Sequence, residues 1–206
     1  WIPEFFGGDA SCCATAIATN GSQVYLEGKG ALQKEVDSAC VQRAMEVLSN
    51  VASTGLLLFE GETPYLVQGS RDDLLVCFPR YGETCIERDD VPSAGITKAN
   101  VFIRGDVERT REVVALLNRE VDGLDFDVPQ AQFSNVMPAG WNKGAALAWL
   151  LEQLGIGRDE AVVFGDAGND LEMFSTVEHS VAVAGALPEA RDAARWHIGA
   201  VEDDAV

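Results

Sequence analysis

Residues 161–173 constrain the fold of this chain more than any other segment. The segment opens with four apolar residues, Ala161–Phe164, continues through a glycine-containing loop, and becomes helical near Leu171. A short strand without polar residues is typical of a parallel sheet that is covered on both faces. A second apolar strand follows at residues 180–184 and a helix at residues 188–195. This alternation predicts an α/β protein with a Rossmann-like parallel sheet.

Two carboxylates flank the loop that leaves the first of these strands. Asp166 comes directly after the strand, where open parallel sheets bind their ligands, and Asp170 follows at the start of the next helix. Two neighbouring carboxylates repel each other unless a cation lies between them. Mg²⁺ suits a site with one or two carboxylates, water and a substrate phosphate. The loop therefore predicts a magnesium site, and the alternative is that one aspartate makes a turn while the other caps a helix.

Lys143 stands at the opening of a helix predicted over residues 144–154. The helix dipole disfavours a cation at this position by roughly 0.3–1 kcal/mol. A lysine is useful there if it contacts an anion bound at the edge of the sheet. The alternative is a solvated surface lysine, which is the commonest situation for this residue type.

These segments together resemble the third and fourth motifs of phosphatases of the haloacid dehalogenase superfamily, most closely the capped Cof-type branch. The resemblance runs from about residue 16 to the end of the chain, and the segments that carry it are Trp141–Leu147, Val163–Met173, Ile17–Gly21, residues 181–190 and Glu202–Val206. It implies a partial Rossmann-like core formed by residues 1–31 and 134–206. The intervening residues 32–133 are expected to form an inserted α+β cap domain.

The resemblance also implies a role for each candidate residue. Lys143, Asp166, Asn169 and Asp170 form the expected catalytic set. Asp166 and Asp170 are the expected Mg²⁺ ligands, with Asp170 acting either through water or by holding Lys143 in place. Lys143 and Asn169 are expected to contact the phosphoryl group, and Asn20 to contact the substrate from the edge of the core.

The family's reaction transfers a phosphoryl group from a small ester, such as a sugar phosphate, to an aspartate. Water then hydrolyses the aspartyl-phosphate intermediate. The family's first motif, a strand followed by the pattern DxDGT, does not occur in this chain, and Asp9 lacks a preceding apolar strand. We therefore expect the nucleophile to lie outside this chain and the chain alone to be inactive. The alternatives are a phosphomutase of the same architecture, or a non-catalytic binding protein or inactive fragment.

The charge of the chain limits its partners. The formal net charge is −18, with 33 acidic and 15 basic residues, and such a surface repels nucleic acid and anionic lipid. A small phosphorylated metabolite is therefore the expected partner. The five cysteines form no CxxC pair, and neither a signal peptide nor an apolar run of roughly 18 residues occurs, so we expect reduced thiols and a cytoplasmic location. The oligomeric state and the specific substrate stay open.

Overall fold

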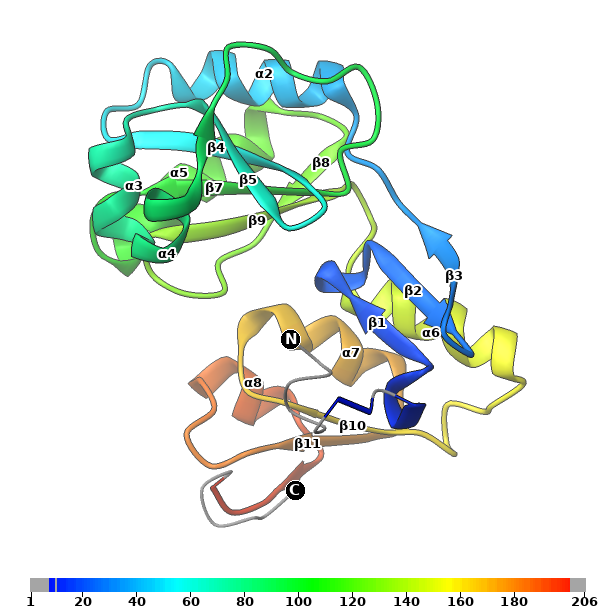
Figure 1. Cartoon of the computed structure of the whole chain (residues 1–206). Coiled ribbons are helices and arrows are strands. Elements are labelled where there is room, and N and C mark those ends of the chain that lie inside the picture. The colour runs from blue at the N-terminus through cyan, green and yellow to red at the C-terminus, as the bar shows by residue number, and fades with distance from the viewer. Residues whose placement is uncertain (1–7, 10, 201–206) are drawn as a thin grey trace.

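The computed structural model describes residues 8–9 and 11–200. The predicted likeness at Glu202–Val206 lies outside these residues. The described chain forms a six-stranded sheet and two smaller sheets (Figure 1). The large sheet has the order β6 (Ile86–Glu87), β5 (Thr63–Gln68), β4 (Thr54–Glu60), β7 (Lys98–Ile103), β9 (Phe133–Pro138) and β8 (Leu124–Phe126).

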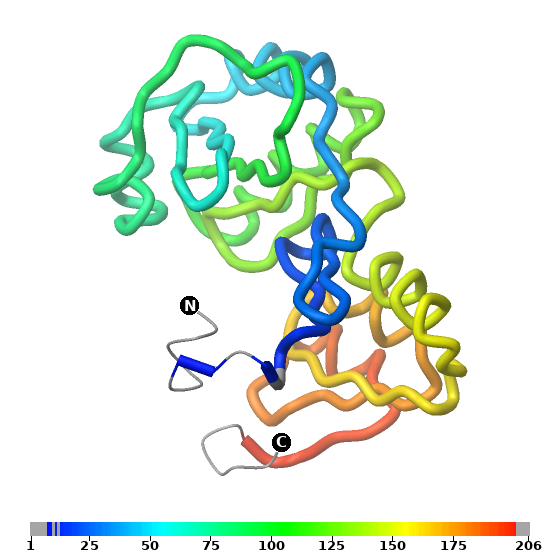
Figure 2. Tube along the Cα trace, turned by 45° about the vertical axis from the view of Figure 1, so that its right-hand side comes forward, coloured from blue at the N-terminus to red at the C-terminus, as the bar shows by residue number. Residues whose placement is uncertain are grey.

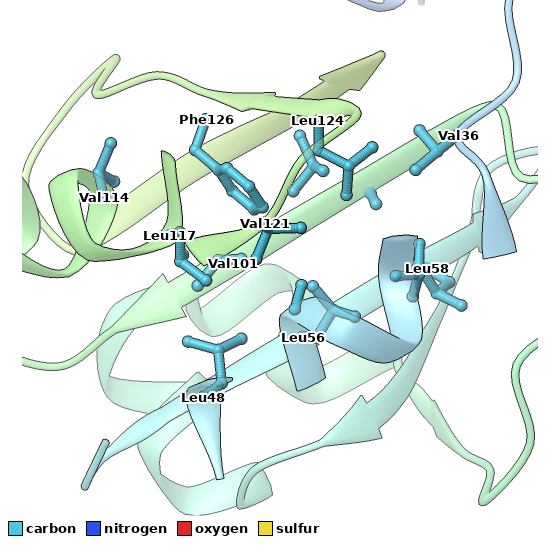
Figure 3. Packing of buried hydrophobic residues seen from close by; sticks show 14 of the residues in the cluster. Val36, Leu48, Leu56, Leu58, Val101, Val114, Leu117, Val121, Leu124 and Phe126 are labelled. Carbon is cyan, nitrogen blue, oxygen red and sulfur yellow. The ribbon is translucent and has the colours of Figure 1, made fainter. Parts of the chain in front are cut away.

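Helices cover both faces of the six-stranded sheet. On one face, α2 (Ser38–Leu48) and α5 (Val107–Glu120) pack against β4 and β7, and Figure 3 shows Leu48, Leu56, Val101 and Leu117 meeting in this layer. Asp37 and Asp106 cap these two helices by accepting hydrogen bonds from backbone N–H groups of the first turn. On the other face, α3 (Arg71–Cys77) and α4 (Pro79–Thr84) pack on a separate apolar cluster.

The N-terminal part forms an antiparallel sheet of its own, which corrects its predicted place in the parallel core. β1 (Ala16–Ala18) and β2 (Gln23–Leu26) are joined by the 3-10 turn η2 (Thr19–Gly21), and β3 (Lys29–Gln33) follows β2. Glu27 and Gly28 have φ values of 50° and 76°, so the chain reverses there directly, and such a tight reversal can join only antiparallel strands. The sheet packs on α6 (Lys143–Leu154) through Val24.

The C-terminal part contains the predicted parallel sheet, formed by β10 (Val162–Gly165), β11 (His179–Ala182) and β12 (Trp196–His197). α7 (Leu171–Thr176) and α8 (Pro188–Ala193) cover one face of it, where Val163 is buried. Val162 and Phe164 are 55% and 43% exposed. The prediction that the first strand is covered on both faces is therefore wrong, because its alternate side chains point away from α7 and α8.

The predicted boundary between residues 133 and 134 falls inside β9. This strand pairs antiparallel with β7 and with β8, so residues 134–138 belong to the six-stranded sheet. The sequence does not reveal that residues 134–138 belong to this sheet, because a strand is assigned to its sheet by pairing with distant strands and not by its local pattern. The six-stranded part therefore connects to the rest of the chain through residues 34–37 and 139–142, which lie on the same side of the molecule (Figures 1 and 2).

The described residues include no helix that is both long and apolar enough to cross a membrane. Cys40, Cys77 and Cys85 are free thiols, as expected. Burial raises the pKa of Cys77 to about 11, so this thiol stays protonated and unreactive at neutral pH.

Candidate active site

Lys143 is the first residue of α6, and this helix N-terminus forms one side of the candidate site. Asn142 caps the helix, its Oδ1 accepting a hydrogen bond from the backbone N–H of Ala145 at 2.9 Å. The indole Nε1 of Trp141 donates to the carbonyl oxygen of Gly21 at 2.9 Å. A side chain at Gly21 would place its Cβ 2.6 Å from the carbonyl oxygen of Asn142, so only glycine permits this approach. The turn η2, with Asn20, is thereby held beside the first residue of α6.

The loop after β10 folds around the carboxylate of Asp170, which is 4% exposed. Asp170 Oδ2 accepts hydrogen bonds from the backbone N–H groups of Asp166 at 3.0 Å and Ala167 at 3.2 Å. Its other oxygen, Oδ1, accepts from Lys143 Nζ at 2.7 Å. A Cβ at Gly165 would lie 2.7 Å from the Cβ of Asp170, so a glycine is required for this closure. The two predicted charged residues, 27 positions apart, thus form an ion pair.

The close packing of α6 on α7 explains why Lys143 reaches Asp170. A Cβ at Gly144 would lie 2.5 Å from both the carbonyl carbon and the carbonyl oxygen of Glu172. Both atoms belong to the backbone and cannot move aside as a flexible side chain would. Gly144 therefore sets the separation of the two helices, and with it the separation of Lys143 and Asp170.

We expect Gly144→Ala to lower the free energy of unfolding by about 1–3 kcal/mol, the usual cost of overpacking. The matched control is Gly30→Ala, because a Cβ at Gly30 would meet nothing within 4 Å. The control is expected to stay within about 0.5 kcal/mol of the parent. Urea denaturation of the three proteins measures the difference, and equal stability of the two variants would contradict the role given to Gly144.

The contacts of Asp170 determine its ionisation. Burial acts to raise the pKa of Asp170, but the hydrogen bonds from Lys143 and from the backbone N–H groups of Asp166 and Ala167, with the charge of Lys143, outweigh it. The pKa therefore lies below its usual value, and the residue is ionised at neutral pH.

Asp166 differs from Asp170 in that its carboxylate is exposed and receives no hydrogen bond from the described residues. Its backbone is fixed on both sides, because its N–H donates to Asp170 and its carbonyl oxygen accepts from the N–H of Leu187 at 2.8 Å. The site thus presents one carboxylate on a fixed backbone, with both oxygens available. Asn169 lies half-buried in the same turn, η3 (Gly168–Asp170).

The donor set bears directly on the expected Mg²⁺. No group of three or more His, Cys, Asp or Glu side chains able to hold a metal occurs within residues 8–9 and 11–200. Mg²⁺ does not need such a cage, because it keeps several waters and commonly takes one or two carboxylates together with the substrate phosphate. Asp166 fits this pattern. Of the two roles left open for Asp170, holding Lys143 is the one that its contacts support.

Sequence reasoning missed one ionisable residue near this site. Asp127 follows β8 in the six-stranded part of the chain, yet the positive charge of Lys143 acts on its carboxyl group. No local pattern marks Asp127, because strand pairing in the large sheet is what brings it towards α6.

Comparisons with known proteins identify the family. A sequence profile for haloacid dehalogenase-like hydrolases matches residues 5–206, and the chain belongs to this family. The mannosylfructose-phosphate phosphatase of Agrobacterium fabrum is 46% identical over 92 residues, which cover 44% of this chain and 35% of that protein. The HMP-PP phosphatase of Klebsiella pneumoniae is 26% identical over 186 residues, which cover 88% of this chain and 67% of that protein. The aligned part thus spans about a third to two thirds of these relatives.

Solved structures show that the fold is shared. The protein SMU.1108c of Streptococcus mutans superposes with a TM-score of 0.85 at 18% identity, over 100% of this chain and 78% of the other. The subclass IIB sugar phosphatase BT4131 gives a TM-score of 0.76 at 16% identity, over 94% of this chain and 73% of the other. The mixed α/β fold therefore matches that of a subclass IIB structure. The expected family is confirmed by the profile match.

Proposed function

We propose that this chain supplies the metal- and phosphate-binding part of a magnesium-dependent phosphatase that hydrolyses small phosphate esters such as sugar phosphates. The observation that carries the proposal is the ion pair between Lys143 and the buried Asp170 beside the exposed carboxylate of Asp166. The names of the relatives from Agrobacterium fabrum and Klebsiella pneumoniae, both phosphatases, support it.

The residues have distinct roles in this proposal. Asp170 orients the ammonium group of Lys143, which then neutralises charge on the phosphoryl oxygens, and the amide of Asn169 donates a hydrogen bond to the same group. Asp166 would hold Mg²⁺, which when bound adds positive charge next to the phosphate. Asn20, held beside α6, is placed to contact the rest of the substrate. Positioning and charge stabilisation of this kind account for most of the catalysis of phosphoryl transfer.

We propose that the nucleophile is an aspartate outside this chain. Asp9 is exposed and accepts a hydrogen bond from the backbone N–H of Ser11 at 2.8 Å, which is the contact of a turn residue. Both oxygens of Asp170 accept hydrogen bonds from its partners, and Asp166 is assigned to the metal. The phosphoryl group would pass from the ester oxygen to that carboxylate, releasing the alcohol, and water would then release inorganic phosphate and restore the carboxylate.

The 206-residue chain is therefore expected to show no turnover of para-nitrophenyl phosphate above background, at any Mg²⁺ concentration. The comparison is the protein in its full encoded length under the same conditions, which is expected to release inorganic phosphate. Equal activity in the two proteins would show that the nucleophile lies within the 206 residues.

A substrate screen on the full-length protein tests the reaction itself. Sugar phosphates are expected to be hydrolysed, and activity confined to phosphopeptides or nucleic acids would contradict the proposal. Transfer of the phosphoryl group to a second sugar instead of water would identify a phosphomutase.

A further inference from the structure

A polar row lies on the face of the six-stranded sheet that is turned towards the N-terminus of α6. Met137 of β9 marks this face, since its sulfur accepts a hydrogen bond from the hydroxyl of Ser22, directly after η2, at 3.7 Å. Side chains alternate along a strand, so Asn135 lies on the same face as Met137. The register of β7 and β9 places Asn100 directly opposite Asn135. Two amide side chains therefore lie side by side on this face, whereas the opposite face of the two strands is apolar apart from Ser134.

These amides form a chain of hydrogen bonds that ends on Asp127. The Nδ2 group of Asn100 donates to Asn135 Oδ1 at 3.1 Å. Asn135 in turn donates through Nδ2 to both carboxylate oxygens of Asp127 at 3.0 Å, and through its backbone N–H to Oδ1 at 2.9 Å. Asn100 and Asn135 are 1% and 7% exposed, so neither is free to turn. The carboxylate of Asp127 is thus held in one orientation.

Asp127 retains capacity to accept a further hydrogen bond. A carboxylate has about four acceptor positions, and Asn135 occupies three of them. The part of the chain that the structure describes offers Asp127 no ion-pair partner within 4.0 Å. Burial raises the pKa of Asp127, while the bonds from Asn135 and the charge of Lys143 oppose this rise. Asp127 is therefore a half-buried acceptor that the charge of Lys143 affects and that forms no ion pair with Lys143.

The amide oxygen of Asn100 supports a role beyond packing. This atom is buried and has no hydrogen-bond partner among the described residues. A buried acceptor without a partner is destabilising, and an apolar pair at Asn100 and Asn135 would avoid that penalty. Phe102, two residues further along β7 and so on the same face as Asn100, shows that this face accommodates apolar residues. The benefit of the amide pair therefore lies in orienting Asp127.

We infer that Asp127 is a specificity-determining residue that accepts a hydrogen bond from a hydroxyl group on the non-phosphate part of the substrate, and that Asn135 is its positioning residue. The inference rests on the proposed function. A carboxylate in this place favours hydroxyl donors and repels anions. The preferred substrates are then sugar monophosphates, and esters with a second phosphate near the six-stranded sheet are poor substrates.

The test compares Asp127→Asn with the parent, both as full-length protein, on three substrates. For a hexose monophosphate, kcat/KM is expected to fall about 10–100-fold, mainly through KM, since a hydrogen bond to a charged acceptor is lost. For para-nitrophenyl phosphate, which has no hydroxyl group to offer, the change is expected to be at most about twofold. For a hexose bisphosphate, the variant is expected to narrow the ratio of kcat/KM between the monophosphate and the bisphosphate. The reason is that the negative charge of Asp127, which repels the second phosphate, is gone.

Two further variants separate recognition from folding. Asn135→Ala is expected to give the same substrate-selective loss as Asp127→Asn, and Asp122→Asn, an exposed aspartate of the same segment, is expected to change nothing. An equal loss on the aryl ester and the hexose ester would overturn the inference. If Asp127→Asn fails to fold, single-deoxy hexose monophosphates assayed on the parent replace it, and the inference fails unless one deletion lowers kcat/KM about tenfold. A parent that hydrolyses no phosphate ester contradicts the proposed function itself, whereas an active but unselective parent contradicts only this inference.

Discussion

Lys143→Met in the full-length protein is expected to lower kcat about 10²–10³-fold, as loss of one preorganised charge-stabilising group typically does. The ammonium group is held at 2.7 Å from Asp170 Oδ1 and would neutralise the transferring phosphoryl group. Lys143→Arg keeps the charge but not the compact shape and is expected to recover part of the activity. Initial rates on a hexose phosphate at saturating Mg²⁺ measure these effects. An unchanged kcat in Lys143→Met would remove Lys143 from the mechanism.

The same substitution is expected to cost about 1–3 kcal/mol of stability, because Asp170 is left buried without its cation. The lowered pKa of Asp170 gives this cost a pH dependence. Its stabilising contribution is present above the ordinary pKa of 3.8 and is lost as the pH falls through the lower folded-state value. Without Lys143, the effect of burial on the pKa is less opposed. The stability gap between parent and variant is therefore expected to be largest near neutral pH and to shrink in acid.

Urea denaturation across this pH range tests the ion pair without any need for activity, so the 206-residue chain serves as well. Asp170→Asn is the companion variant, and the double variant closes a thermodynamic cycle. A coupling energy near zero would mean that Lys143 and Asp170 act independently. That result would contradict the role of Asp170 as the residue that positions Lys143.

Asp166→Asn is expected to abolish most Mg²⁺-dependent turnover while leaving the fold intact. Its carboxylate is exposed and makes no hydrogen bond with the described residues, so the free energy of unfolding should change by no more than about 0.5 kcal/mol. Loss of the carboxylate is expected to weaken Mg²⁺ binding at least tenfold, or by about 1.4 kcal/mol. Isothermal titration calorimetry with Mg²⁺ and inorganic phosphate measures the change directly.

The contrast between the two aspartates sharpens this test. Asp170→Asn is expected to lower stability, whereas Asp166→Asn is expected to lower metal affinity. Asp192→Asn, an exposed aspartate on α8, controls for the loss of one negative charge. If Asp170→Asn abolished Mg²⁺ binding while Asp166→Asn retained it, the two roles would have to be exchanged.

Much of the local structure follows from the sequence. Asp37 and Asp106 each precede an apolar helical pattern and cap the helix that follows, because an aspartate side chain satisfies the first backbone N–H groups. The sequence Gly-Asp-Ala-Gly-Asn-Asp after an apolar strand predicted the loop, and Gly165 is glycine because Asp170 leaves no space for a Cβ. These features depend on contacts within a few residues, which a local pattern can specify.

The division of the chain into sheets could be predicted less well from the sequence. Residues 134–138 of β9 were assigned to the wrong side of the predicted boundary. Ser134 and Asn135 interrupt the apolar pattern of this strand, and Asn135 pairs with Asn100 of β7, 35 residues upstream. β1 was placed in a parallel sheet, although the turn η2 reverses the chain between β1 and β2 and makes this pair antiparallel. Strand partners are chosen by non-local hydrogen bonds, and one sequence does not specify them.

The sequence by itself determined the chemical types that meet at the site: a lysine at a helix start, an aspartate after a strand, and a second aspartate one turn later. Only the tertiary structure decided which role each of these residues has. Both oxygens of Asp170 are engaged by Lys143 and by the loop backbone, so this carboxylate orients the lysine, while Asp166 stays open to a ligand. The three-dimensional arrangement also brought Asp127 under the influence of Lys143. The reason is that hydrogen-bond partners and charge separations depend on how α6, α7 and the sheets pack, which no spacing along the chain encodes.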